Sequence, residues 1–262
     1  MIMAVPSFAW AHDAWVQTNT NLVRAGDVVH VDLMLGNHGN THRDYKLAGK
    51  LDPAGSKLEV VGPKGQAYDL RSQLSDVGYS PQEGYWTARF EPVVPGLYVV
   101  SHQSDRVMSY APERSIKGAK TYFVASPSLD NIPAKNPGFD RPLGHDLELV
   151  PLVNPVAPLG TGSLLRVRLL YKGKPLAGER VSFIPRGGML KPGPELDERY
   201  ERLTDRQGEV TFEPNEANYY LIAAHKTEPG EKGTLDGKPY QFTKYGATLN
   251  VYVPKICPCC GG

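Results

Sequence analysis

The sequence predicts an all-β protein made of two immunoglobulin-like β-sandwich domains joined by a Pro-rich linker. The chain has 262 residues, which suits one large or two ordinary domains. Its 23 Pro and 27 Gly interrupt a sequence that carries 14 Tyr. The apolar runs are short and are separated by turn dipeptides, a pattern typical of many short strands. Long helices are therefore not expected.

The first strand that the pattern predicts covers residues 27–35, DVVHVDLML. Its apolar residues recur with period two, so they share one face, and the strand is half-buried. His30 lies on the opposite face and is expected at the solvated surface. Further strands of this half are predicted at Lys57–Gly62, Tyr85–Phe90, Gly96–His102 and Thr121–Ala125. Together they define an N-terminal β-sandwich over residues 12–126.

Residues 127–143 separate the two halves, because they are rich in proline and poor in apolar residues, which favours an extended linker. A second β-sandwich is predicted over residues 144–254 and is followed by a Cys-rich tail at 255–262. Two packed sheets with frequent turns form the immunoglobulin-like arrangement. Its strands are expected at Leu147–Val153, Ser163–Tyr171, Arg180–Pro185, Glu209–Phe212, Asn218–His225 and Gly246–Val253.

The charge of the chain is nearly balanced, with 29 basic and 28 acidic side chains. No strong field therefore points to nucleic acid or to an anionic membrane. After residue 11 no stretch approaches the roughly 20 apolar residues that span a bilayer, so the mature protein is not expected to cross a membrane.

Residues 1–11, MIMAVPSFAWA, resemble the end of a secretory signal. They are apolar and finish in Ala9-Trp10-Ala11, which fits the small-x-small cleavage pattern. No basic segment precedes them, so we expect a longer signal whose beginning is missing or misassigned. Cleavage before His12 would place the mature protein in the periplasm or outside the cell. The alternative is an N-terminus that is disordered or forms a first strand.

His12 would be the first residue of the mature protein. Its α-amine and its ring Nδ1 can then close a chelate ring on one metal ion, which an internal histidine cannot do. With reference pKa values of about 7.7–8.0 for the amine and about 6.5 for imidazole, little free energy is needed to deprotonate both at neutral pH. The alternative is that cleavage leaves a histidine there by chance.

Four more histidines are considered as candidate metal ligands. His38 and His42 lie in the glycine-rich segment GNHGNTH after the first predicted strand, and neutral imidazole suits nickel, cobalt, copper or zinc. His102 has the strand parity of Tyr98, so it points inward if Tyr98 does. His225 ends a predicted strand of the second half, and whether it joins a site stays open. Solvated loops and satisfied core or rim histidines are the competing interpretations.

The tail KICPCCGG holds Cys257, Cys259 and Cys260, the only cysteines of the chain. An odd number cannot all pair within one chain, so they form a candidate secondary metal or redox site, or they oxidise. Their spacing is not that of a structural zinc site. The sequence contains no nucleophile elbow, phosphate loop or zincin helix, and we therefore expect no enzymatic activity.

Two resemblances follow from these motifs. The segments GKPLAGERVSFIPRGG and LTDRQGEVTFEPNEANYYLIAAH resemble bacterial immunoglobulin-like and carboxypeptidase-regulatory-like modules, which are usually scaffolds. HDAWVQ, RAGDVVHVDLMLGNHG and PGLYVVSHQSDR together resemble the bacterial family of domain-of-unknown-function 4198. That resemblance implies a periplasmic, substrate-specific component of nickel and cobalt uptake, with a mature chain that begins with histidine and aspartate.

The resulting hypothesis is a periplasmic protein that binds a divalent nickel, cobalt or copper ion through His12, His38, His42 and His102 and passes it to a membrane transporter. A second hypothesis is a copper-dependent oxidoreductase that acts on polysaccharide, with Trp15, Tyr85 and Trp86 as an aromatic platform. The third is a non-catalytic structural or adhesion protein in which the histidines are incidental.

Overall fold

The structure is a computed structural model, and it describes residues 12–36, 38, 51–78, 83–130, 132–133, 135–157 and 159–255. The described residues form strands and one 3-10 turn, η1 (Arg71–Gln73), and contain no α-helix. The all-β class is therefore confirmed. Within the same residues, no helix has the length and apolarity that crossing a membrane requires.

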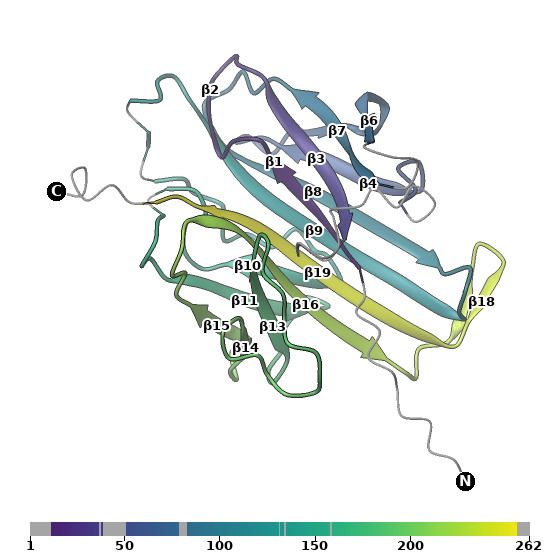
Figure 1. The fold of residues 1–262 in the computed structure, drawn as a ribbon. Helices are drawn as coiled ribbons and strands as arrows, with labels where there is room; N and C mark the ends of the chain where they lie inside the picture. The colour runs from purple at the N-terminus through teal and green to yellow at the C-terminus, as the bar shows by residue number, and fades with distance from the viewer. Residues whose placement is uncertain are drawn as a thin grey trace, which may run out of the picture.

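A large central sheet runs through both halves of the chain (Figure 1). Its strand order is β14 (Glu201–Leu203), β13 (Arg180–Pro185), β16 (Asn218–Glu228), β19 (Phe242–Val253), β9 (Glu113–Ser126), β8 (Gly96–Val107), β4 (Ser56–Val61) and β5 (Ala67–Asp69), and β2 (Leu22–Arg24) also pairs with β9.

Two smaller sheets and one hairpin complete the fold. The N-terminal sheet has the order β1 (Asp13–Thr18), β3 (Val29–Gly36), β7 (Gly84–Phe90) and β6 (Ser75–Gly78). The C-terminal sheet contains β10 (Leu147–Pro151), β11 (Leu165–Tyr171), β12 (Lys174–Pro175) and β15 (Glu209–Phe212). The hairpin is formed by β17 (Gly233–Leu235) and β18 (Lys238–Tyr240) and lies at one end of the long central strands (Figure 1).

The two smaller sheets cover opposite faces of the central sheet. On β8, Tyr98 and Val100 belong to the core under the N-terminal sheet, whereas Leu97 and Val99 belong to the core under the C-terminal sheet. Side chains of a strand alternate between its two faces, so these two sets point in opposite directions. Strand β9 alternates in the same way. The fold is thus sandwich-like, with one sheet shared by both sandwiches.

The halves are joined by parallel pairing of β9 with β19, in the register that sets Gly246 opposite Lys117. This pairing makes one continuous sheet where the sequence predicts two separate sandwiches. The described residues between 127 and 143 contain no strand, and several of them are packed rather than free. Phe139 packs against the C-terminal core and its carbonyl accepts a hydrogen bond from the Tyr122 hydroxyl at 3.0 Å.

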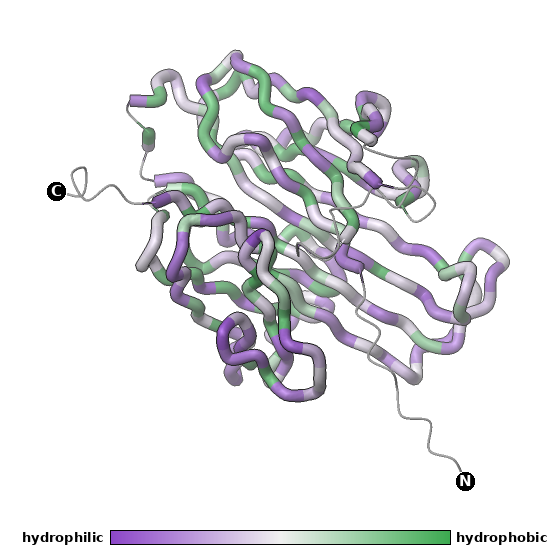
Figure 2. Tube along the Cα trace, in the orientation of Figure 1, coloured by the Kyte–Doolittle hydropathy of each residue, from purple (hydrophilic) through white to green (hydrophobic). Residues whose placement is uncertain are grey.

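The predicted alternation of β3 is confirmed. His30 is exposed, and the apolar residues of the other face are buried: Val29, Val31, Leu33 and Leu35. Hydrophobic residues follow the strands of both sandwiches, and hydrophilic residues prevail toward the hairpin end of the molecule (Figure 2). Strand β1, which the sequence pattern does not predict, is buried along its whole length and pairs with β3.

Candidate functional site

Three adjacent strands of the central sheet place a histidine, a glycine and a lysine side by side. His225 on β16 lies opposite Gly246 on β19, and Gly246 lies opposite Lys117 on β9. Gly246 has no side chain, and a Cβ built there would lie 3.8 Å from His225 Cδ2 and 3.8 Å from Lys117 Cγ. The side chains of His225 and Lys117 therefore flank an open strip over β19.

The start of β1 lies over this strip. The backbone of Asp13 pairs with Gly36 of β3, and its carboxylate Oδ1 accepts a hydrogen bond from His225 Nε2 at 2.7 Å. Lys117 Nζ donates to the carbonyl oxygen of His12, and Thr248 Oγ1 donates to the carbonyl oxygen of Ala14 at 2.8 Å. The main chain at the proposed mature terminus is thus fixed by contacts with the central sheet.

Asp13 and His225 each stabilise the charged form of the other. Burial opposes ionisation of Asp13, but the charges of His225, Lys117 and His12 and the hydrogen bond from His225 together lower its pKa. The Asp13 charge in turn raises the pKa of His225, against the effect of burial. The Asp13 side chain is nearly covered, whereas half of the His225 side chain is exposed to solvent. The pair is therefore an ion pair with one side open to solvent.

His102 points inward, as its parity with Tyr98 predicts, and both side chains are buried. Neither ring nitrogen of His102 has a hydrogen-bond partner among the described residues. Burial, together with the positive charge of Lys117, lowers the pKa of His102 to about 3. The imidazole is accordingly neutral at physiological pH, the form that binds metal ions.

His38 contacts different elements from His102. Its ring Nδ1 lies 3.0 Å from the carbonyl oxygen of Ile184 on β13, and because a carbonyl can only accept, Nδ1 carries the proton. Its ring meets Trp15 edge-on with the centroids 5.5 Å apart. Nε2 has no partner among the described residues, and burial lowers the pKa of His38 to about 3.

The remaining predicted ligands are not placed. His42 and the cysteines Cys257, Cys259 and Cys260 lie outside the described residues. Among the side chains that are described, no three of His, Cys, Asp or Glu type lie close enough together to hold a metal ion. The structure thus brings Asp13, the chain neighbour of His12, into contact with His225, and it places His38 and His102 in other surroundings.

One residue of the aromatic platform in the second hypothesis, Trp15, is not at the surface. Trp15 is completely buried, so it cannot present a surface to a polysaccharide. It packs with Met34 and Leu221 in a small cluster of its own. The physical reason is that both faces of β1 are covered, so side chains of either parity are buried.

Sequence reasoning missed the pairing of Asp13 with His225, because 212 residues separate them. The only indication in the sequence is that His225 ends a predicted strand, where side chains of different strands can converge. The parallel contact of β9 with β19 decides the pairing, and no local pattern encodes that contact.

A family model, "Domain of unknown function (DUF4198)", matches residues 9–228. The chain belongs to the DUF4198 family. The match spans the proposed mature terminus, both sandwiches and His225, so it covers every element that forms the cluster around β1 except β19. No curated protein matches this DUF4198 chain.

Solved structures resemble the DUF4198 chain only remotely. Salmonella alpha-2-macroglobulin reacted with methylamine is 15% identical, with 93% of this chain and 15% of that chain covered and a TM-score of 0.25. A DUF4785 family protein from Legionella pneumophila is 15% identical, with 80% and 50% covered and a TM-score of 0.26. The mouse nectin-like molecule 4 ectodomain is 11% identical, with 94% and 65% covered and a TM-score of 0.23. The chain spans less than two thirds of each, and these likenesses carry no functional argument.

Proposed function

We propose that this DUF4198 protein binds a divalent nickel, cobalt or copper ion at the start of β1 and carries it as cargo to a membrane transporter. The observation that supports this most directly is the contact of Asp13 with His225 beside His12, with half of the His225 side chain open to solvent. In the proposal the ion displaces the proton that His225 Nε2 shares with Asp13 Oδ1, 2.7 Å away. The carboxylate and the neutral imidazole then supply the oxygen and nitrogen donors that such ions prefer.

The ligand set differs from the one that the sequence predicts. Asp13 and His225, which contact each other, are proposed to join His12 as ligands once the terminus is processed, because the described side chains alone do not form a group that holds a metal ion. His38, His42 and His102 are left as secondary candidates. Removal of residues 1–11 would free the α-amine of His12, which adds a nitrogen donor that the described residues lack. The proposal therefore includes secretion to the periplasm or the cell exterior and cleavage before His12.

Lys117 has a positioning role in this proposal. Its ammonium group holds the carbonyl oxygen of His12, which directs the main chain of the terminus toward the central sheet. Its positive charge also favours the ionised form of Asp13. The carboxylate is then available as an anionic ligand at neutral pH.

The test is calorimetric titration of nickel into two forms of the protein, one that begins at His12 and one extended by a single residue. We expect the extended form to bind at least about tenfold more weakly, since the chelate ring needs the free amine. His225→Ala should weaken binding by a similar factor, whereas His30→Ala, which removes an exposed histidine of β3, should not. Equal affinity of all four proteins would overturn the proposal.

The two rival functions are separated by other measurements. A copper-dependent oxidoreductase would oxidise chitin or cellulose when it is supplied with copper and a reductant, and the burial of Trp15 weakens that hypothesis. A structural or adhesion protein would be isolated without bound metal when it is purified without an affinity tag. Nickel, cobalt or copper in such a preparation favours the metal-binding function.

A further inference from the structure

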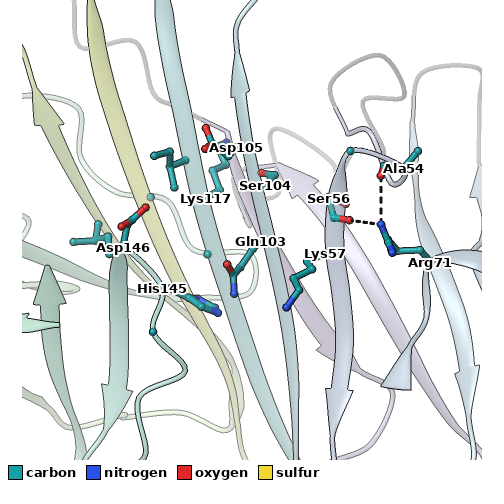
Figure 3. A pocket seen from close by; sticks show the side chains of 16 residues that line it. Ala54, Ser56, Lys57, Arg71, Gln103, Ser104, Asp105, Lys117, His145 and Asp146 are labelled. Carbon is teal, nitrogen blue, oxygen red and sulfur yellow. Dashed lines mark hydrogen bonds between the residues drawn. The ribbon is translucent and has the colours of Figure 1, made fainter. Parts of the chain in front are cut away.

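A cavity of about 470 Å³ lies on the other face of the central sheet, the face that the C-terminal sheet partly covers. Its walls are β4, β8 and β9 on one side and the loop that leads into β10 on the other (Figure 3). A volume of this size suits a small molecule. Of its lining residues, the metal-binding proposal uses only Gly246 and Lys117, whose ammonium group is directed to the carbonyl oxygen of His12.

Most of the charged groups that line the cavity are neutralised by neighbours. Arg71 is held by Asp69 at 2.6 Å and also donates to main-chain oxygens, and Asp105 is held by Arg114 at 2.5 Å. Lys117 is directed to the carbonyl oxygen of His12. A ligand that binds to any of these groups would therefore have to displace an existing partner.

Two charged side chains and one amide of the lining remain, namely Lys57, Asp146 and Gln103. Lys57 has only an exposed contact with Glu59 at 3.3 Å, a type of ion pair that contributes little and exchanges easily. The carboxylate of Asp146 and the amide of Gln103 make no hydrogen bond or ion pair within the described part of the chain. In Figure 3, Gln103 lies between Lys57 on one side and Asp146 on the other.

The strand register sets this arrangement. Lys57 on β4 is opposite Gln103 on β8, and Gln103 is opposite Gly118 on β9. Strands β4 and β9 are thus two strand spacings apart, about 10 Å. His145 packs against Gly118 of β9, so its neighbour Asp146 lies on the β9 side of the cavity, about this far from the strand that carries Lys57. A molecule of dipeptide length, about 7 Å when extended, spans this distance with the help of the flexible lysine side chain.

The floor of the cavity carries no charge of its own. His145 packs on Gly118, where a Cβ would lie only 2.5 Å from its Nδ1, and its Nε2 lies 3.1 Å from Ser101 Oγ. Burial lowers the pKa of His145 to about 4, so its imidazole is neutral at pH 7. It therefore does not repel a cationic group that approaches Asp146.

We propose that this cavity binds a small zwitterion of the dipeptide class, with its carboxylate on Lys57, its peptide group on Gln103 and its ammonium group on Asp146. The amide of Gln103 can both donate to and accept from a peptide group. Opposite charges at the two ends of the cavity select a ligand with opposite charges at its own ends.

The test is calorimetric titration of diglycine into the full chain with a chelator present, so that the outcome is independent of metal binding. Two derivatives serve as probes: N-acetyl-diglycine lacks the ammonium group, and diglycine amide lacks the carboxylate. We expect each derivative to bind at least about tenfold more weakly than diglycine, since each loses one charged hydrogen bond.

Two variants test which end of the ligand Lys57 and Asp146 bind. Lys57→Gln should weaken diglycine about tenfold but leave diglycine amide unchanged, and Asp146→Asn should weaken diglycine but leave N-acetyl-diglycine unchanged. Lys64→Gln and Asp236→Asn remove exposed charges outside the cavity and should bind like the unmodified protein. Absence of diglycine binding, or equal affinity for all three probes, would overturn the proposal.

Discussion

Lys120 and Glu148 form an ion pair that is almost completely buried between the central sheet and the C-terminal sheet, with Nζ 2.7 Å from Oε1. Glu148 also accepts hydrogen bonds from the backbone N–H groups of Leu143, Gly144 and His145. The pair therefore fixes the end of the segment between the two sandwiches, and with it the wall of the cavity that contains His145.

Removing one member of this pair should strongly destabilise the protein. Glu148→Gln leaves the Lys120 ammonium buried without its counter-charge, and an expected loss of about 3–5 kcal/mol follows. Urea unfolding measures the change in the free energy of unfolding. The double variant Lys120→Met/Glu148→Gln should lose less than the sum of the two single variants, and strict additivity would contradict the coupling.

Gly118→Ala should destabilise the protein by about 1–3 kcal/mol, because the new Cβ would overlap His145 Nδ1. Gly230→Ala is the matched control, since a Cβ at that position meets no atom within 4 Å. Thermal unfolding of both variants gives the comparison. Equal melting temperatures would show that His145 moves aside without loss.

Acid should destabilise the protein through its buried histidines. The pKa values of His38 and His102 are about 3 and that of His145 is about 4, all below the value of 6.5 for an exposed imidazole. Below pH 6.5 the unfolded state therefore binds more protons than the folded state, and stability falls as the pH decreases toward 4. Each unit of difference corresponds to about 1.4 kcal/mol per histidine.

One variant tests how much of this acid dependence comes from His102. His102→Leu removes one of the three groups, so its free energy of unfolding should change less steeply between pH 6.5 and 4 than that of the unmodified protein. Denaturant unfolding at several pH values provides the slopes. A variant with an unchanged slope would mean that His102 is protonated equally in both states.

The N-terminus of the secreted protein should be His12. Intact-mass spectrometry of protein isolated from the periplasm or the medium checks this expectation, and the metal content of the same sample can be measured. A mature chain that begins at another residue would remove the amine from the proposed chelate.

The sequence by itself determined the local structure. Period-two alternation identified β3 with its buried valines and exposed His30, and parity with Tyr98 predicted that His102 points inward. Both inferences succeed because the alternation of side chains along a strand is a property of the strand itself.

Only the tertiary structure decided how the strands combine. The parallel pairing of β9 with β19 turned two expected sandwiches into two that share a sheet, and it placed His225 beside Asp13 across 212 residues. The physical reason is that an edge of a strand can pair with any other strand of matching register. Which one it meets depends on how both cores bury their apolar faces, and no short segment encodes that.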